Sequence, residues 1–170
     1  RNPRPSDVMS LTRRLDLFGL FVFVTLCLLV SAAGGMVTAT SVDTWYQALA
    51  KPSFNPPDWV FAPVWTALYF LMGVSGWRIW RRRASRATRG ALALFGLQLF
   101  LNFAWSVLFF GFQRIDLALI DIVILFVAIV ANMILFWRIE RLATLLLVPY
   151  AAWVVFAIVL NVSIWLINVT

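Results

Sequence analysis

Residues 17–37 read LFGLFVFVTLCLLVSAAGGMV, and no side chain in this stretch carries a charge. The hydrocarbon core of a bilayer is about 30 Å thick, so an α-helix needs roughly 20 apolar residues to cross it. Transmembrane β-strands are shorter, at about ten residues, and alternate between apolar and polar side chains. The stretch is too long and too uniformly apolar for such a strand. It predicts a transmembrane helix.

Four further apolar blocks follow the first one along the chain. Charged residues separate the blocks, and only the block over residues 117–137 contains a charge, Asp121. The blocks span residues 59–77, 90–112, 117–137 and 142–168. We therefore predict an all-α membrane protein, a bundle of five transmembrane helices that forms a single domain over residues 17–168. We expect a disordered, basic segment over residues 1–16 and a long structured loop over residues 38–58, between the first two helices.

The composition favours a membrane protein over a soluble one. Of the 170 residues, 63% are hydrophobic and 12% are charged, whereas an average soluble domain is about half apolar and a quarter charged. The chain has no His, and Cys27 is its only Cys. This excludes His-based catalytic triads, His-ligated zinc sites and an intrachain disulfide. We expect no metal site and no required cofactor.

Basic residues are distributed unevenly between the two sides of the predicted bundle. The chain has 14 Lys and Arg residues, and all but Lys51 and Arg114 fall on the side of the N-terminus. Cytoplasmic loops of membrane proteins carry such an excess. We therefore place the N-terminus in the cytoplasm and the C-terminus outside, in the inner (plasma) membrane of a bacterium. The same asymmetry explains the basic composition without nucleic-acid binding.

Two basic stretches have alternative interpretations. The run Arg81–Arg83 is most simply an anchor that sets the topology, and alternatively a binding site for anionic lipid headgroups. The pair Arg13-Arg14, followed by an apolar run and by the small residues 31–33, also resembles a signal peptide. The apolar character continues to residue 37, beyond that cleavage site, which favours a transmembrane helix.

The loop over residues 38–58 has more order than a simple linker needs. Its first part places side chains on one face of a short amphipathic helix, at Val42, Trp45, Tyr46 and Leu49. Its second part contains prolines, which restrict the backbone even before folding, at Pro52, Pro56 and Pro57. Two interpretations are open: a lid over a pocket between the helices, and an aromatic belt at the membrane surface.

Polar and aromatic side chains recur at helical spacing in the half of the predicted bundle beneath this loop. Residues at i, i+4 and i+8 share one face of a helix. Three such sets occur: Phe61, Trp65 and Tyr69; Gln98, Asn102 and Ser106; Trp153, Ala157 and Asn161. Because polar side chains facing lipid would lack hydrogen-bond partners, these faces should point inward. They either line a ligand cavity or hydrogen-bond the helices together.

Asp121 is an acid within a predicted transmembrane helix, and such residues often have a function. It lies little more than one turn inside the membrane, so it can also reach the interface. A functional and a structural role are therefore equally compatible with its position. We include it among the candidate binding residues.

These residues belong to a series of short motifs that resembles the motifs of one known protein family. The motifs in the loop and the second helix are Trp45-Tyr46, Lys51-Pro52, Asn55-Pro56-Pro57, Trp59-Val60-Phe61, Pro63-Val64-Trp65-Thr66 and Leu68-Tyr69. Those in later helices are Gln98, Leu101-Asn102, Trp105-Ser106, Pro149-Tyr150, Trp153, Phe156-Ala157, Leu160-Asn161 and Trp165. Over roughly residues 15–167 the chain resembles the TspO/MBR family, the tryptophan-rich sensory proteins that include the translocator protein or peripheral-type benzodiazepine receptor.

The resemblance implies a five-helix bundle, often dimeric, with a pocket that the first loop covers and that binds tetrapyrroles such as protoporphyrin IX. Trp65 and Trp153 look like two pocket tryptophans linked in some members to light-dependent porphyrin degradation. Further matches are Asn102, Ala157 and Leu160 in the pocket, Asp121 as an acid of some members, and Trp45, Tyr46 and Pro56 in the lid. The resemblance does not extend to the family's sterol motif, which needs a basic residue after Tyr150.

We therefore expect an integral membrane receptor or sensor that binds a tetrapyrrole, or another flat hydrophobic ligand, inside the bundle. The porphyrin is a ligand, and Lys51 or Arg114 near the mouth is expected to pair with its carboxylates. The alternative function is an enzyme that degrades porphyrin with Trp65 and Trp153. A small transporter fits less well, because no internal repeat is visible. We expect a homodimer in the lipid bilayer.

Overall fold

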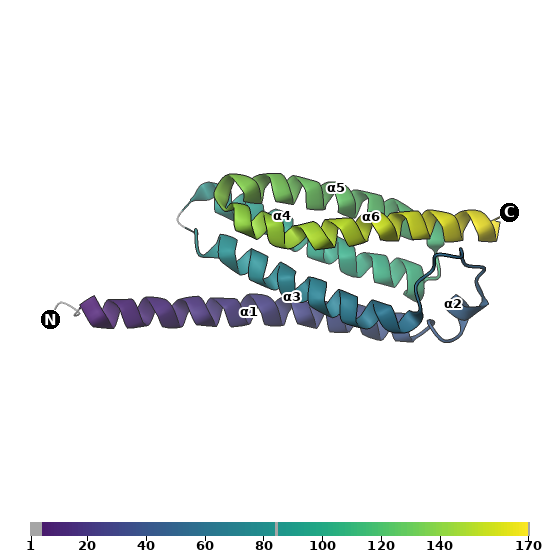
Figure 1. Ribbon diagram of the computed structural model, residues 1–170, viewed down its shortest axis with the longest axis horizontal. Helices are drawn as coiled ribbons and strands as arrows, with labels where there is room; N and C mark the ends of the chain where they lie inside the picture. Colours follow the sequence, from purple (N-terminus) through teal and green to yellow (C-terminus); the bar gives the residue numbers. More distant parts are fainter. Residues whose placement is uncertain (1–4, 84, 170) are drawn as a thin grey trace.

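The computed structural model describes residues 5–83 and 85–169, which form five long helices and three short helical segments (Figure 1). The long helices are α1 (Pro5–Ala39), α3 (Phe61–Trp80), α4 (Arg86–Ser106), α5 (Ile115–Ile139) and α6 (Arg141–Val169). The short segments are α2 (Trp45–Ala48), the 3-10 turn η1 (Asp58–Val60) and the π-helical turn η2 (Val107–Gly111). All five long helices are long and apolar enough to cross a membrane, which confirms the predicted fold class.

The first helix is longer than predicted, and the expectation of disorder over residues 1–16 is wrong for residues 5–16. These residues are helical and continue without a break into the apolar run. Pro5 occupies the first helical position, where its missing N–H costs no hydrogen bond. No Pro or Gly occurs between Pro5 and Gly19, so nothing in the sequence ends the helix at the membrane boundary. Residues 1–4 lie outside the described part of the chain.

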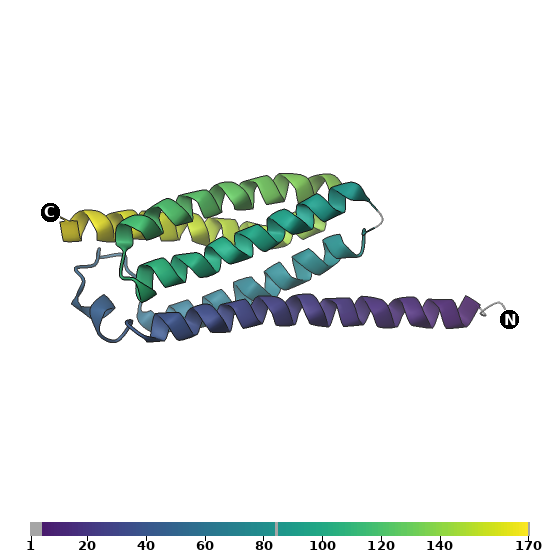
Figure 2. The same cartoon turned by 180° about the vertical axis from the view of Figure 1, so that it is seen from behind.

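The long helices pack in a closed ring. Contacts run from α1 to α3, from α3 to α6, from α6 to α5, from α5 to α4, and from α4 back to α1 (Figures 1 and 2). Helices α1 and α3 approach each other so closely that a Cβ added to Gly73 would lie 2.7 Å from the Cα of Val24. Small residues permit such close packing between membrane helices.

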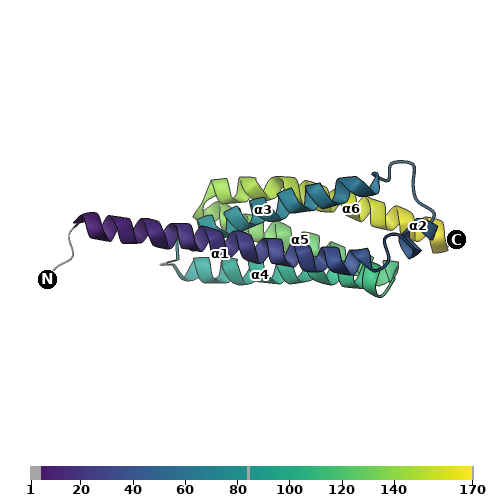
Figure 3. The same ribbon diagram turned by 90° about the horizontal axis from the view of Figure 1, so that it is seen from below.

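The connections gather at the two ends of the bundle (Figure 3). One end, which we call the arginine end, holds the α3–α4 and α5–α6 turns with residues 78–89 and 138–141. There Arg78 pairs with Glu140, and the Nε atom of Arg81 lies 3.3 Å from a carboxylate oxygen of Asp16. The opposite end, the loop end, holds α2, η2 and the end of α6 (Figure 1). This arrangement places the ordered loop far from most of the arginines.

The outer surface of the bundle is apolar. Phe18, Phe100 and Val127, on three different helices, expose 66%, 64% and 63% of their surface. A soluble protein rarely exposes large contiguous apolar areas, whereas hydrocarbon solvates such side chains without cost. The chain is therefore a multi-pass integral membrane protein whose surroundings are a lipid bilayer.

Candidate ligand-binding site

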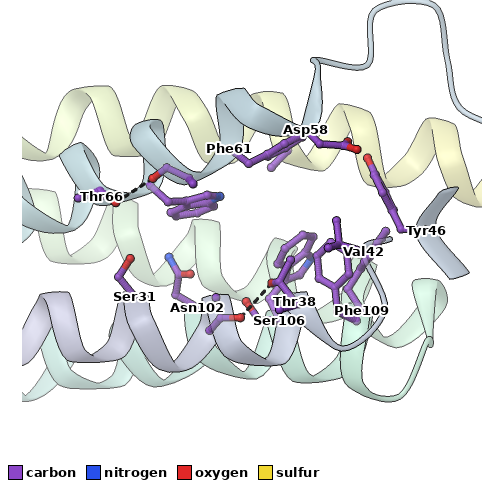
Figure 4. A pocket seen from close by; sticks show the side chains of 18 of the residues that line it. Ser31, Thr38, Val42, Tyr46, Asp58, Phe61, Thr66, Asn102, Ser106 and Phe109 are labelled. Carbon is purple, nitrogen blue, oxygen red and sulfur yellow. Dashed lines mark hydrogen bonds between the residues drawn. The ribbon is translucent and has the colours of Figure 1, made fainter. Parts of the chain in front are cut away.

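A cavity of about 620 Å³ lies inside the loop end of the bundle. Its walls come from α1, α3, α4, η2 and α6, and the loop that contains α2 closes one side of it (Figure 4). Among the described lining residues none comes from α5. The lining includes Ser31, Thr38, Tyr46, Asp58, Phe61, Trp65, Thr66, Tyr69, Asn102, Trp105, Ser106, Phe109, Trp153, Phe156, Ala157, Leu160 and Asn161.

Two tryptophans from different helices form one aromatic wall of the cavity. The rings of Trp65 on α3 and Trp153 on α6 meet edge to face, with 6.5 Å between their centroids and an interplanar angle of 87°. The rings of Phe61 and Phe156 also pack against the Trp153 ring, with centroid distances of 6.2 and 5.3 Å. The indole Nε1 of Trp153 is buried and has no hydrogen-bond partner among the described residues. It is therefore an unpaired donor that is enclosed by protein atoms.

A chain of buried hydrogen bonds forms the floor of the cavity. The Tyr69 hydroxyl donates to Oδ1 of Asn102 over 2.9 Å, and Nδ2 of Asn102 donates to the Tyr150 hydroxyl over 2.7 Å. The Tyr150 hydroxyl in turn donates to Oε1 of Gln98 over 2.8 Å. Three helices are thereby joined, and the Asn102 amide is held in one orientation. Asn102 thus combines the two roles that the sequence left open, since it lines the cavity and also bonds the helices together.

A second polar contact crosses the bundle nearer the loop. The Trp105 indole donates to Oδ1 of Asn161 over 3.1 Å, and Nδ2 of Asn161 donates to the backbone oxygen of Ile115 over 3.1 Å. Trp105 also stacks on Phe109 of η2, with 5.0 Å between the ring centroids. Single π-helical turns occur frequently at functional sites, and here the turn brings Phe109 and Phe110 into the cavity lining.

The loop is fastened to the helices near its start and near its middle. The Ser41 hydroxyl donates to the backbone oxygen of Phe110 over 2.8 Å. Near the middle of the loop, the backbone N–H of Ala50 donates to Oδ1 of Asn168, and Nδ2 of Asn168 donates to the backbone oxygen of Ala50, over 3.1 and 2.9 Å. The loop is therefore a structured cover and not a free linker.

Tyr46 is the buried centre of this cover. Its ring packs on Phe109 and Phe110, and its hydroxyl donates to Oδ1 of Asn55 over 2.9 Å. Burial, followed by the nearby Asp58 carboxylate, raises the pKa of Tyr46 to about 12. The hydroxyl therefore keeps its proton over the physiological range and stays a donor.

Nine of the thirteen candidate binding residues line the cavity. They are Tyr46, Phe61, Trp65, Tyr69, Asn102, Trp153, Ala157, Leu160 and Asn161. Their shared faces point inward as the helical spacing predicted. Whether they bind a ligand stays a prediction.

The other four candidates lie outside the cavity lining. Trp45 packs edge-on against Phe109, and Pro56 lies in the outer part of the loop. Gln98 is beneath the floor, one helical turn beyond Asn102, where it accepts the bond from Tyr150. Asp121 is buried on α5, and its Oδ2 has no hydrogen-bond partner among the described residues. The sequence predicted how deep Asp121 lies in the membrane. It did not predict that α4 and α6 separate α5 from the cavity.

The charges near the mouth differ from the expected ones. Lys51 hydrogen-bonds the backbone oxygens of Gln47 and Leu49, and Arg114 forms a salt bridge with Asp116 at 2.7 Å. Neither basic residue lines the cavity, and the described lining instead contains two acids, Asp43 and Asp58. The expected pairing of Lys51 or Arg114 with ligand carboxylates is therefore not supported by the geometry.

The contribution of α1 to the cavity wall was not predicted from the sequence. Ser31, Gly35 and Thr38 line the cavity at i, i+4 and i+7 (Ser31 and Thr38 in Figure 4). Their spacing is a usable signal, because small and hydroxylated residues on one face of a transmembrane helix leave room beside it. The stretch around Ser31 that resembled a cleavage site is a continuous part of this helix.

Comparisons with known proteins all indicate the same family. The sequence profile of the TspO/MBR family matches residues 23–166. The tryptophan-rich protein TspO of Archaeoglobus fulgidus is 40% identical over 154 residues, 91% of this chain and 99% of the relative. The Sus scrofa translocator protein is 37% identical, over 81% of this chain and 85% of its own. The tryptophan-rich sensory protein of Cereibacter sphaeroides is 36% identical, over 78% and 84%. The chain belongs to the TspO/MBR family.

Proposed function

We propose that this protein is a membrane receptor or sensor that binds a tetrapyrrole, or a similarly flat hydrophobic molecule, in the cavity beneath the loop. The observation that carries the proposal is the cavity itself, about 620 Å³ in volume and walled by Trp65, Trp153 and their aromatic neighbours. Ligand pockets commonly have volumes of about 300–1,000 Å³ and a mostly apolar lining with a few polar groups.

The chemistry of the lining supports a flat aromatic ligand. Aromatic side chains stack on π-systems, each pair contributing roughly 0.5–1.5 kcal/mol beyond the burial of area. The fixed amide of Asn102 offers a polar contact at the cavity floor, whereas the unpaired N–H of Trp153 is covered by protein atoms. Among the relatives, one is called a sensory protein and another a translocator protein, and a receptor role is consistent with the first name.

The acids at the mouth restrict which part of the ligand lies near the loop. Asp43 and Asp58 would repel a carboxylate placed beside them. A porphyrin diacid should therefore bind with its carboxylates directed away from these acids, and a neutral diester of the same ring should bind more tightly. This expectation replaces the predicted pairing with Lys51 or Arg114.

Titration of the purified protein with protoporphyrin IX, monitored by quenching of Trp fluorescence, tests the proposal. We expect saturable quenching, and tighter binding of the dimethyl ester than of the diacid. Trp65→Phe and Trp153→Phe should each weaken binding several-fold. The control is Trp137→Phe, which changes a half-exposed residue of α5 outside the cavity lining. Quenching that does not saturate, or an equal loss of affinity in the control, would show that the proposal is wrong.

Degradation of porphyrin is the second candidate function. The specific observation in its favour is the edge-to-face pair of Trp65 and Trp153, two readily oxidised rings that would lie against the ligand. Illumination of the complex separates the two functions. Loss of the porphyrin absorption bands that is abolished by Trp65→Phe or Trp153→Phe, but not by Trp137→Phe, supports an enzyme. An unchanged spectrum supports a receptor.

The proposal includes an orientation and an oligomeric state. The clustering of Arg78–Arg89 and Arg138–Arg141 at one end supports a cytoplasmic arginine end, with the cavity opening toward the outer side of a bacterial inner membrane. A homodimer is proposed on the family resemblance alone. Labelling of cysteines introduced at exposed positions in the loop and in the α3–α4 turn, with a membrane-impermeant maleimide in intact cells, tests the orientation. Reaction of the loop position alone is expected.

A further inference from the structure

A second hollow lies at the arginine end, and it shares no lining residue with the cavity at the loop end. We propose that it binds an anionic phospholipid, with the headgroup phosphate between Arg82 and Arg138. The hollow has a volume of about 380 Å³, and its lining comes from the α3–α4 turn, the first turns of α4 and the last turns of α5. The lining residues are Arg82, Ser85, Ala87, Thr88, Leu135, Arg138 and Ile139.

The arginines of this end differ in how far they are neutralised. Arg78 pairs closely with Glu140, and Arg81 pairs with Asp16. Arg82 only approaches Glu140, at 3.8 Å through Nε, and its side chain is 64% exposed. Arg138 is exposed and forms no salt bridge with any described residue. The two arginines that line the hollow therefore have guanidinium N–H groups free for an anion, and guanidinium matches phosphate geometry well.

The backbone around the hollow is fixed and adds to the positive potential. The Ser85 hydroxyl caps the start of α4 by accepting the N–H of Thr88, and the fully buried Thr88 hydroxyl donates to the backbone oxygen of Arg82 over 2.9 Å. The hydrogen bond from Thr88 holds the backbone of Arg82 against the first turn of α4. The N-terminus of α4 carries a partial positive charge at the same place.

The apolar side of the hollow favours a lipid over a soluble phosphate. Leu135 and Ile139 are one helical turn apart on the same face of α5. Leu135 is the deeper of the two, because α5 ends at Ile139. An acyl chain lying along these side chains would point into the bilayer while its phosphate lay beside the guanidinium groups. A free phosphate would use the arginines alone.

The test compares two variants with the same change of charge. The hollow variant combines Arg82→Gln with Arg138→Gln. The control variant combines Arg86→Gln with Arg89→Gln, two exposed arginines of α4 that do not line the hollow. Detergent-solubilised protein is titrated with a phosphatidylglycerol, a phosphatidylcholine of the same chain length and glycerol 3-phosphate, and binding is measured by native mass spectrometry. Circular dichroism checks the fold of each variant, and Arg138→Gln alone repeats the test with a single exposed substitution.

We expect phosphatidylglycerol to bind the unmodified protein more tightly than the other two probes. The hollow variant should bind phosphatidylglycerol about tenfold more weakly, because each arginine near a membrane surface contributes substantially to the attraction of anionic lipid. The control should lose about twofold or less. Equal losses in both variants would overturn the proposal, because the attraction would then come from diffuse surface charge. Equal binding of phosphatidylcholine, or of glycerol 3-phosphate, would also overturn it.

Discussion

The two halves of α3 face the same bundle interior and have opposite effects on it. In the half near the loop, Phe61 and Trp65 hold the helices apart around the cavity. In the half near the arginine end, Gly73 and Gly76 let α1 approach until an added Cβ would lie within 3 Å of Val24 and Phe23 atoms. The difference shows that the size of the side chains along one helix decides where the bundle opens and where it closes.

The floor network divides the open half from the closed half. Tyr69 and Asn102 line the cavity, whereas Tyr150 is fully buried below them and does not. Hydrogen bonds connect Tyr150 to Asn102, and Asn102 to Tyr69. The closed half can therefore position the cavity floor without contacting the ligand. Substitutions on the two sides of this boundary should therefore separate stability from binding.

The largest effect is expected from Gly73→Ala in the closed half. The new methyl group would meet the backbone of Val24 at 2.7 Å, and neither helix can move without opening the core. Overpacking of this kind costs roughly 1–3 kcal/mol, and a clash with backbone should fall near the upper limit. Thermal unfolding in detergent measures the loss as a lower Tm.

The matched control is Gly35→Ala on α1, in the open half. An added Cβ there meets nothing within 4 Å, although Gly35 lines the cavity. Because Ala is favoured over Gly inside a helix by roughly 0.5–1 kcal/mol, stability should be unchanged or slightly higher. If the two substitutions lower Tm equally, the contrast between a closed and an open half is incorrect.

An intermediate effect is expected from Tyr150→Phe. The ring stays, but Nδ2 of Asn102 and Oε1 of Gln98 each lose a partner. Unsatisfied buried groups cost about 1–3 kcal/mol in soluble proteins, and hydrogen bonds between membrane helices average about 0.6 kcal/mol. We expect a stability loss of about 1 kcal/mol with porphyrin affinity within about twofold of the original. A large loss of affinity without loss of stability would place Tyr150 in the binding site itself.

The smallest effect on stability is expected from Asn168→Ala. Asn168 is exposed, and it ties the middle of the loop to α6 through two hydrogen bonds with Ala50. Because water can replace exposed hydrogen bonds, the stability loss should stay below about 1 kcal/mol. The loop should open more often, so a bound porphyrin should dissociate about threefold faster in stopped-flow measurements. The partly exposed Ser163→Ala, also on α6, serves as control, and identical rates in both variants would show that Asn168 does not hold the loop closed.

The sequence predicted the membrane spans well because charge and hydropathy act locally. Charges such as Asp58, Arg89 and Arg114 lie close to helix ends, as the cost of burying a charge in hydrocarbon requires. The beginning of α1 was not predictable in this way, since an uncapped helix can continue into water when no Pro or Gly interrupts it. The π-helical turn η2 was missed as well, because it depends on packing against the loop through Ser41 and Tyr46.

The candidate site was predictable only where the spacing of residues within a single helix indicates which face of that helix points into the bundle. The spacing of Trp153, Ala157 and Asn161 placed all three in the cavity lining. Asp121 lies outside the lining because α5, which carries it, contributes no described residue to the cavity, and the neighbours of a helix are set by the ring order and not by its sequence alone. The pairing partners of Lys51 and Arg114 were local, within four residues, and left both unavailable to the cavity.

The central claim is that the loop-covered cavity is where the ligand binds, and filling it tests this most directly. Ala157→Phe adds a ring inside the cavity, whereas Ala152→Phe adds the same ring to an exposed position of α6 outside the lining. In an equilibrium titration with protoporphyrin IX dimethyl ester, we predict a loss of affinity of about tenfold or more, about 1.4 kcal/mol, for Ala157→Phe. Ala152→Phe should stay within about twofold of the original protein. Equal affinities for the two folded variants would contradict the claim.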